Sequence, residues 1–248
     1  MSVVALWLLA VGLADLARWS VERPSWRRSV IGLLTAAVVA LTLALLLGFS
    51  AGATMLSASI VTAGVAGWFW TSDRALDRAK RSGWPLTLML AYVAGLLAAT
   101  GIAPEPAGLL SQWYAGLQIP PLDVLPLEKF LLGLGALIFL QGTANRITRL
   151  MLLGAGTPAS LGESTLKGGR IIGPMERTLI FALGATGQLT AATVVLAAKG
   201  VLRFPEIRSV TDLERDEKKQ ADISSVTEYF LIGTLASWLL AFALTVLL

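Results

Sequence analysis

Long apolar runs, each separated from the next by a short polar segment, constrain the fold of this chain more than any other feature of its sequence. A helix needs about 20 apolar residues to cross the hydrocarbon core of a bilayer. Hydrophobic residues make up 55% of the chain and charged residues only 15%. Runs and composition together predict an all-α fold, a polytopic membrane helix bundle with six to seven hydrophobic segments. The runs are residues 29–49, 52–70, 86–103, 127–144, 178–198 and 228–248, with a shorter one at 2–17.

The basic residues indicate how the segments are oriented. Nineteen of the 20 Lys and Arg residues fall in the segments 18–28, 71–85, 142–177 and 199–227. Short loops rich in Lys and Arg stay on the cytoplasmic side of a membrane, because cationic loops resist translocation. The loop at 104–126 contains neither residue, which is typical of an exported loop. The pattern predicts a multi-pass protein of the bacterial cytoplasmic membrane, with its N-terminus outside and most loops that carry Lys or Arg in the cytoplasm.

The run at 178–198 does not fit this orientation as a simple crossing. A full crossing would place the six basic residues of the segment 199–227 on the outer side. The sequence from Leu183 to Gln188 contains two glycines and a carboxamide, which would permit a re-entrant hairpin with its second arm beginning near Gln188. The N-terminal end of that arm would carry a partial positive charge inside the membrane. A plain crossing, with the glycines used for close helix packing, stays open.

The chain shows no internal repeat, so we expect residues 1–248 to form a single transmembrane bundle. Within it we expect a cytoplasmic loop at about 154–172 and a charged cytoplasmic linker at about 206–226. Gly173 followed by Pro174 is typical of a helix start. Gly48 and Gly52 have the spacing of a close helix contact, and such small-residue faces suggest a homo-oligomer.

Ionisable side chains gather near the expected cytoplasmic ends of the last segments. Lys199 and Arg203, for example, are one helical turn apart. A ring of basic side chains at this level, with two glutamates as internal partners, would bind phosphate. The predicted substrate-binding residues are Arg146, Arg149, Arg170, Glu176, Arg177, Gln188, Lys199, Arg203 and Glu228. The alternative is that these side chains only anchor the helix ends to lipid headgroups.

Residues that are absent narrow the chemistry. The chain has no His and no Cys, which excludes haem ligation by those residues, His/Cys zinc sites, His general bases and thiol nucleophiles. Asp73 and Asp77 could share a helix face for a hard cation, but Arg74 and Arg78 flank them, which favours a solvated helix extension. We therefore expect neither a metal nor a cofactor. The net charge of +4 comes from the cytoplasmic loops, and it favours anionic lipids over nucleic acid as partners.

The C-terminal third, about residues 168–248, carries a distinctive set of short motifs. They are Gly169-Arg170-Ile171-Ile172-Gly173, Glu176-Arg177, Gly187-Gln188, Ala198-Lys199, Arg203-Phe204 with Glu206, Glu228-Tyr229, Ile232-Gly233-Thr234 and Ser237. In these residues the segment resembles the conserved end of an uncharacterised bacterial inner-membrane family, a domain of unknown function. The resemblance implies a membrane location and a set of positions, but no activity.

Three classes of function are compatible with these features. The first is a membrane protein that binds and translocates an anionic, phosphate-bearing or lipid substrate near its cytoplasmic face. The second is a membrane-embedded lipid-phosphate enzyme with Glu176 or Glu228 as general base. The third is a non-catalytic scaffold or accessory subunit. The sequence favours the first class and does not identify the substrate.

Overall fold

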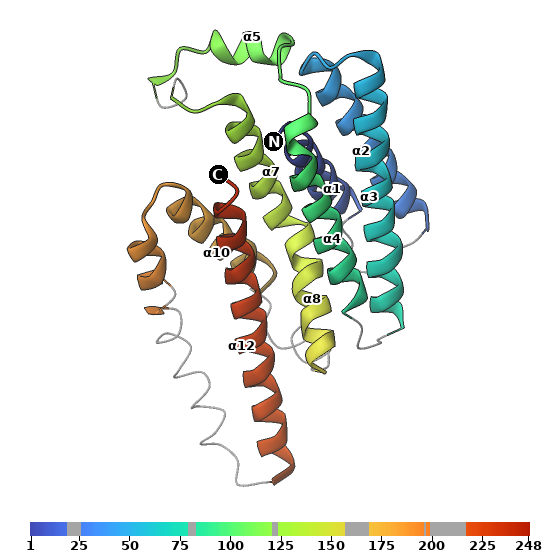
Figure 1. The fold of residues 1–248 in the computed structure, drawn as a ribbon. Helices are drawn as coiled ribbons and strands as arrows, with labels where there is room; N and C mark the ends of the chain where they lie inside the picture. The colour runs from blue at the N-terminus through green and yellow to red at the C-terminus, as the bar shows by residue number, and fades with distance from the viewer. Residues whose placement is uncertain (19–25, 79–82, 121–123, 157–168, 196, 199–216) are drawn as a thin grey trace. The chain divides into compact units, whose positions relative to one another are not determined.

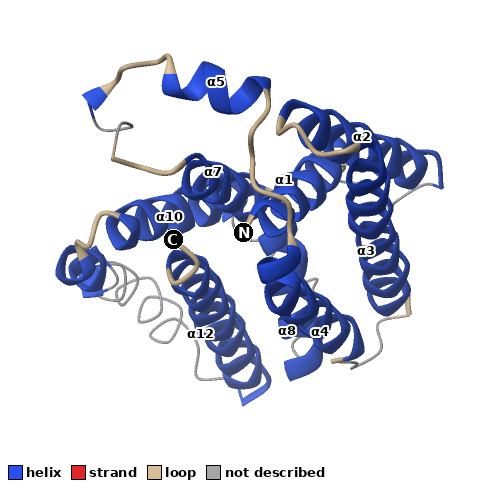
Figure 2. Cartoon of the chain, turned by 45° about the horizontal axis from the view of Figure 1, so that its top comes forward, coloured by secondary structure: helices blue, strands red, loops and turns tan. Residues whose placement is uncertain are grey.

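The computed structural model describes the backbone of residues 1–18, 26–78, 83–120, 124–156, 169–195, 197–198 and 217–248, and the side chains of these residues except 169–172 and 217–230. All regular secondary structure in these ranges is helical, and they contain no strand (Figures 1 and 2). The predicted all-α class is confirmed.

Three helices are long and apolar enough to cross a membrane. They are α2 (Trp26–Leu46), α3 (Ala51–Asp77) and the helical stretch Trp84–Ile102, which joins α4 (Trp84–Ala98) to η1 (Ala99–Ile102). Their most apolar windows have mean hydropathies of 2.5, 1.3 and 1.8. A fourth span results if α7 (Leu127–Gln141) and α8 (Thr143–Ala155), which meet at a bend of 50°, cross together. The described residues thus provide three or four candidate spans.

The remaining apolar runs form helices of other kinds. The first run is α1 (Ser2–Ala17), whose 16 residues fall short of the usual crossing length. The last run lies in α12 (Glu217–Thr245), of which Leu231–Thr245 is apolar. A short helix, α5 (Leu109–Ala115), occupies the loop that the sequence predicts to be external. Six or seven full spans remain a prediction.

The chain divides into two compact units, and the first comprises residues 1–78 and 83–146 together with Leu248. Its central helix is α1, which contacts α2, α3, α4 and α7. Val4, Ala10 and Ala14 have no exposed surface, as expected for a helix that is apolar on every side and packed on every side. Glycine makes one of these contacts possible, because a Cβ atom on Gly12 would lie 2.8 Å from the backbone nitrogen of Phe139 in α7.

A tight turn connects α2 to α3. Gly48 adopts a φ of +81°, and Ser50 caps α3 by accepting a hydrogen bond from the backbone of Ala53. Gly48 lies against Gly108 in a loop, whereas Gly52 faces open space. Among the described residues, the helix contact predicted for this pair of glycines is therefore not found.

The second unit comprises residues 79–82 and 147–247, and within it α10 (Gly169–Ala185) packs against α12. Gly184 of α10 lies close to Thr245, whose Oγ1 atom would be 2.8 Å from an added Cβ. The helix begins at Gly169, so the helix start predicted at Gly173 and Pro174 is wrong. Pro174 lies inside α10, where its missing N–H removes a single backbone hydrogen bond near the first turn.

The apolar run at 178–198 is broken within the glycine-containing stretch that would permit a re-entrant hairpin (Figure 1). The α10 helix ends at Ala185, Gly187 adopts a φ of +74°, and helix resumes over residues 189–195. The backbone N–H of Gln188 donates to the carbonyl of Leu183 at 2.7 Å, and that of Gly187 to Gly184 at 3.0 Å. These two bonds form a Schellman motif, which requires a residue that tolerates positive φ. The break supports a re-entrant hairpin, which remains a proposal.

Replacing Gly187 with alanine is expected to destabilise the second unit by about 1–2 kcal/mol, because an L side chain is strained at this φ. The measurement is loss of helical circular dichroism as the purified chain is titrated with SDS in mild detergent. The matched control is Gly173→Ala, since Gly173 lies inside α10 with nothing within 4 Å of an added Cβ. That variant should gain up to about 1 kcal/mol. Equal effects of both variants would contradict the role assigned to Gly187.

Candidate functional site

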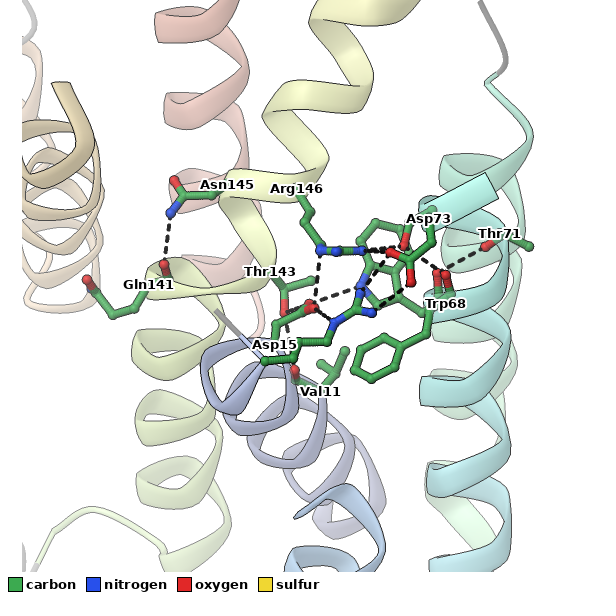
Figure 3. Close-up of polar contacts among 12 residues, drawn as sticks. Val11, Asp15, Trp68, Thr71, Asp73, Gln141, Thr143, Asn145 and Arg146 are labelled. Carbon is green, nitrogen blue, oxygen red and sulfur yellow. Dashed lines mark hydrogen bonds and ion pairs between the residues drawn. The ribbon is translucent and has the colours of Figure 1, made fainter. Parts of the chain in front are cut away.

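Four charged side chains from three separate stretches of the sequence meet inside the first unit (Figure 3). Asp15 lies in the last turn of α1, and Arg18 caps the end of that helix. Asp73 lies near the end of α3, and Arg146 lies in the first turn of α8. We call Asp15, Arg18, Asp73 and Arg146 the four-charge network.

Asp15 is the most connected member of the network. Its Oδ1 atom lies 3.1 Å from Nε of Arg18 and 3.5 Å from Nε of Arg146. Its Oδ2 atom accepts hydrogen bonds from Nε1 of Trp68 at 3.0 Å and from Oγ1 of Thr143 at 2.8 Å. Both carboxylate oxygens are therefore satisfied, which is the condition for keeping a charge away from water.

Asp73 is held by both arginines. Arg18 donates from its two terminal nitrogens, at 2.9 Å to Oδ2 and 3.3 Å to Oδ1 of Asp73. Arg146 donates from NH1 to Oδ1 of Asp73, and the same nitrogen lies 2.9 Å from Oγ of Ser72. One carboxylate thus receives a bidentate guanidinium and part of a second guanidinium, an arrangement suited to any planar or tetrahedral oxyanion.

The network has a dry inner half and a wetter outer half. The side chains of Asp15 and Arg18 are each 2% exposed, whereas those of Asp73 and Arg146 are each 19% exposed. The guanidinium carbon of Arg18 also lies 3.3 Å from the ring centre of Phe69, a cation–π contact. Burial, and then the charge of Arg146, lower the pKa of Arg18, whereas Asp15 and Asp73 raise it. The two positive and two negative charges balance, so the network as a whole carries no net charge. Its outer pair is partly exposed and therefore accessible to water or an ion.

The structure describes some of the residues that the sequence predicts to bind an anion. Arg146 belongs to the first unit and is bound by Asp15 and Asp73. Arg149, Glu176, Arg177 and Gln188 belong to the second unit. Only the backbone is described for Arg170 and Glu228, and Lys199 and Arg203 lie outside the described residues. A single ring that joins these residues therefore remains a prediction.

Arg177 has a definite place within the second unit. Its side chain is 2% exposed, and NH1 lies 3.3 Å from Oγ of Ser237, which ties α10 to α12. Ser237 in turn donates to the carbonyl of Gly233 at 2.8 Å. Three residues of the motifs that carry the sequence resemblance are thus linked by direct contacts. Gln188, by contrast, is exposed just after the helix break.

Comparison of the chain with models of protein families, with curated proteins and with solved structures finds no match. The relation of the C-terminal third to an inner-membrane family is accordingly a proposal that rests on the motifs quoted above. Functional reasoning on this chain starts from its own geometry.

Sequence reasoning missed three of the four charges as parts of a site. Asp15 interrupts an apolar run and is followed three residues later by Arg18, and a charge in such a run is costly unless it is paired. That signal could have identified the inner pair. The expectation that Asp73 lies on a solvated helix extension is wrong, because one face of this extension packs against Arg18 and Arg146. Asp77, one turn further on, is exposed as expected.

Proposed function

We propose that this is a multi-pass membrane protein that binds and translocates an anionic, phosphate-bearing substrate at the outer half of the four-charge network. One observation carries the proposal: guanidinium groups from the end of α1 and from α8 converge on the single, partly exposed carboxylate of Asp73. A phosphate group presents oxygens in a similar geometry and with at least as much negative charge. Asp73 then acts as a resident anion that a substrate displaces.

Displacement of Asp73 leaves the two arginines in position, because Asp15 holds both of them through their Nε atoms. The terminal nitrogens of Arg18 and Arg146 become available to the substrate. The end of α3 is at the same time released from Arg18 and Arg146. Substrate binding is thereby coupled to the contacts of one membrane-crossing helix, since the substrate favours the state in which Asp73 is detached.

A scaffold or accessory subunit is the second candidate, and the balance of charges favours it. In that case the four-charge network only clamps α1, α3 and α8 together, and no external anion takes part. Networks of this type are structural in many proteins, because breaking one leaves an uncompensated charge. The two candidates differ in what the loss of the Asp73 charge does.

Replacing Asp73 with asparagine is expected to strengthen the binding of glycerol phosphate by about tenfold, because the competing carboxylate charge is lost and both arginines remain. Binding is measured on the purified full chain in detergent by isothermal titration calorimetry. The variant Arg146→Gln should abolish it. Asp77→Asn, an exposed change on the same helix, serves as the charge-matched control and should leave affinity unchanged. The scaffold would be supported instead if Asp73→Asn lost stability and neither the wild-type chain nor Asp73→Asn bound glycerol phosphate.

A further inference from the structure

Three large tryptophans are exposed at the ends of the membrane-crossing helices of the first unit. Trp26 opens α2 and is 73% exposed, and Trp84 opens α4 and is 61% exposed. Trp70 is 62% exposed and lies two turns before the end of α3. Tryptophan is enriched where a bilayer meets water, because its ring is apolar and its N–H is polar.

Contacts between the helices show that these three side chains lie at similar levels along α3. Gly32 of α2 contacts Phe69, and Gly64 of α3 contacts Tyr92 of α4. Consecutive helices run in opposite directions, as α3 and α4 do in Figure 1. Trp26 is six residues, about 9 Å, before Gly32, and Trp84 is eight residues, about 12 Å, before Tyr92. Both therefore fall within about 8 Å of the level of Trp70.

The length of α3 fits a bilayer whose surface lies at this level. Ser50, the N-cap of α3, precedes Trp70 by twenty residues, or about 30 Å of helix, which matches the thickness of the hydrocarbon core. The stretch between them contains no charged residue. Met55, Leu56 and Ile60 are exposed along it, as expected for side chains in contact with lipid. Charged residues first appear after Trp70, at Asp73 and Arg74.

Two of the tryptophans carry a guanidinium group over their rings. The guanidinium carbon of Arg27 lies 5.7 Å from the ring centre of Trp26, and that of Arg74 lies 5.0 Å from the ring centre of Trp70. Each contact holds an arginine next to an exposed tryptophan ring, where its remaining N–H groups are available to lipid phosphates. Anionic phospholipids fit this surface best, because the exposed Arg27, Arg74 and Arg78 outnumber the exposed Asp77, and the opposite ends of α2 and α3 carry no basic residue.

We propose that Trp26, Trp70 and Trp84 lie at the headgroup level of an anionic leaflet, where Arg27 and Arg74 bind phospholipid phosphates, and that the anion received by the four-charge network is such a lipid headgroup. The second part rests on the proposed function. Asp73 follows Trp70 by three residues, about 4.5 Å of helix, which places the outer half of the network at phosphate depth. A lipid phosphate at this depth needs no passage through the hydrocarbon core to meet Arg146.

The depth of α3 tests the first part, and the absence of cysteine makes the test direct. Full-length single-cysteine variants Ile60→Cys, Trp70→Cys and Trp84→Cys are spin-labelled and reconstituted into vesicles of phosphatidylcholine with a minority of phosphatidylglycerol. Collision rates with oxygen and with a polar nickel chelate give the depth of each label. We expect the label at 60 to be deepest and the labels at 70 and 84 to lie about 15 Å shallower. If the labels at 70 and 84 both lie as deep as the label at 60, the proposed surface is overturned.

Lipid selectivity tests the role of Arg74. Spin-labelled phosphatidylglycerol and phosphatidylcholine are compared for the fraction of lipid immobilised by the protein. Arg74→Gln should lower the preference for phosphatidylglycerol about two- to fivefold. The control is Arg78→Gln, because Arg78 is exposed one turn further from the hydrocarbon core. Equal losses in both variants overturn the assignment of Arg74 as a headgroup ligand.

A binding experiment in detergent distinguishes the two possible sources of the phosphate group, a lipid headgroup and a free anion. Short-chain phosphatidylglycerol and free glycerol phosphate are compared for their ability to raise the unfolding temperature of the wild-type chain. We expect the lipid to act at concentrations at least about tenfold lower. Equal potency assigns the site to a soluble anion and overturns the lipid source, while the proposed function stands. If neither ligand has an effect, the proposed function fails, and the depth measurement still decides the position of the leaflet.

Discussion

Replacing Asp15 with asparagine is expected to lower the free energy of unfolding of the first unit by about 3–5 kcal/mol, because two arginines then face one carboxylate in a largely buried site. Arg18 suffers most, since its side chain is 2% exposed. The variant is titrated with SDS in mild detergent, and unfolding is followed by helical circular dichroism. This change tests the link on which the other contacts of the network depend.

Asp77→Asn is the matched control for this measurement, and it should change stability by less than about 0.5 kcal/mol, because Asp77 is exposed. The double variant Asp15→Asn with Arg18→Gln restores the charge balance and should recover part of the loss. If the double variant loses as much stability as the two single variants lose together, or more, Asp15 does not act through Arg18.

Replacing Gly12 with alanine is expected to destabilise the first unit by about 1–3 kcal/mol, because the methyl group has no room between α1 and α7. The added Cβ atom would lie 2.8 Å from the backbone nitrogen of Phe139 and 2.9 Å from Cγ2 of Ile138. Backbone cannot rotate away as a flexible side chain can, so the two helices must separate. Thermal unfolding in detergent provides the measurement.

The same substitution at Gly67 should have the opposite sign. Gly67 lies in the interior of α3, and nothing is within 4 Å of an added Cβ. Alanine there should stabilise the helix by up to about 1 kcal/mol. If both variants lose stability alike, flexibility of glycine rather than the α1–α7 contact determines the result at Gly12.

The positions of the helices follow closely from the apolar runs. The runs at 2–17 and 52–70 correspond to α1 and to most of α3, since a membrane helix satisfies its backbone internally and depends little on other parts of the chain. The break after Ala185 was also predictable, because Gly187 can adopt the positive φ that ends a helix. The number of spans stays a prediction, since the described residues provide three or four candidates by length and composition.

The pairing of the outer charges with the inner ones was beyond the reach of sequence reasoning for a physical reason. Arg18 and Asp73 are separated by 55 positions, and Asp73 and Arg146 by 73. Which charges pair over such distances depends on how α1, α3 and α8 pack, and this is decided by contacts such as that of Gly12 with Phe139. Charges at helix ends, among them Arg146 in the first turn of α8, were predictable as a class. Their partners were not.

The order in which the chain is synthesised gives Asp15 a particular problem. Its carboxylate leaves the ribosome well before Thr143, which lies 128 residues later in the chain and donates a hydrogen bond to it in the folded protein. At about 5–20 residues per second the interval is on the order of ten seconds. Arg18, three residues away, can neutralise Asp15 throughout this time. The pair thus keeps the end of α1 without a net charge, and the later helices close around a site that is already neutral.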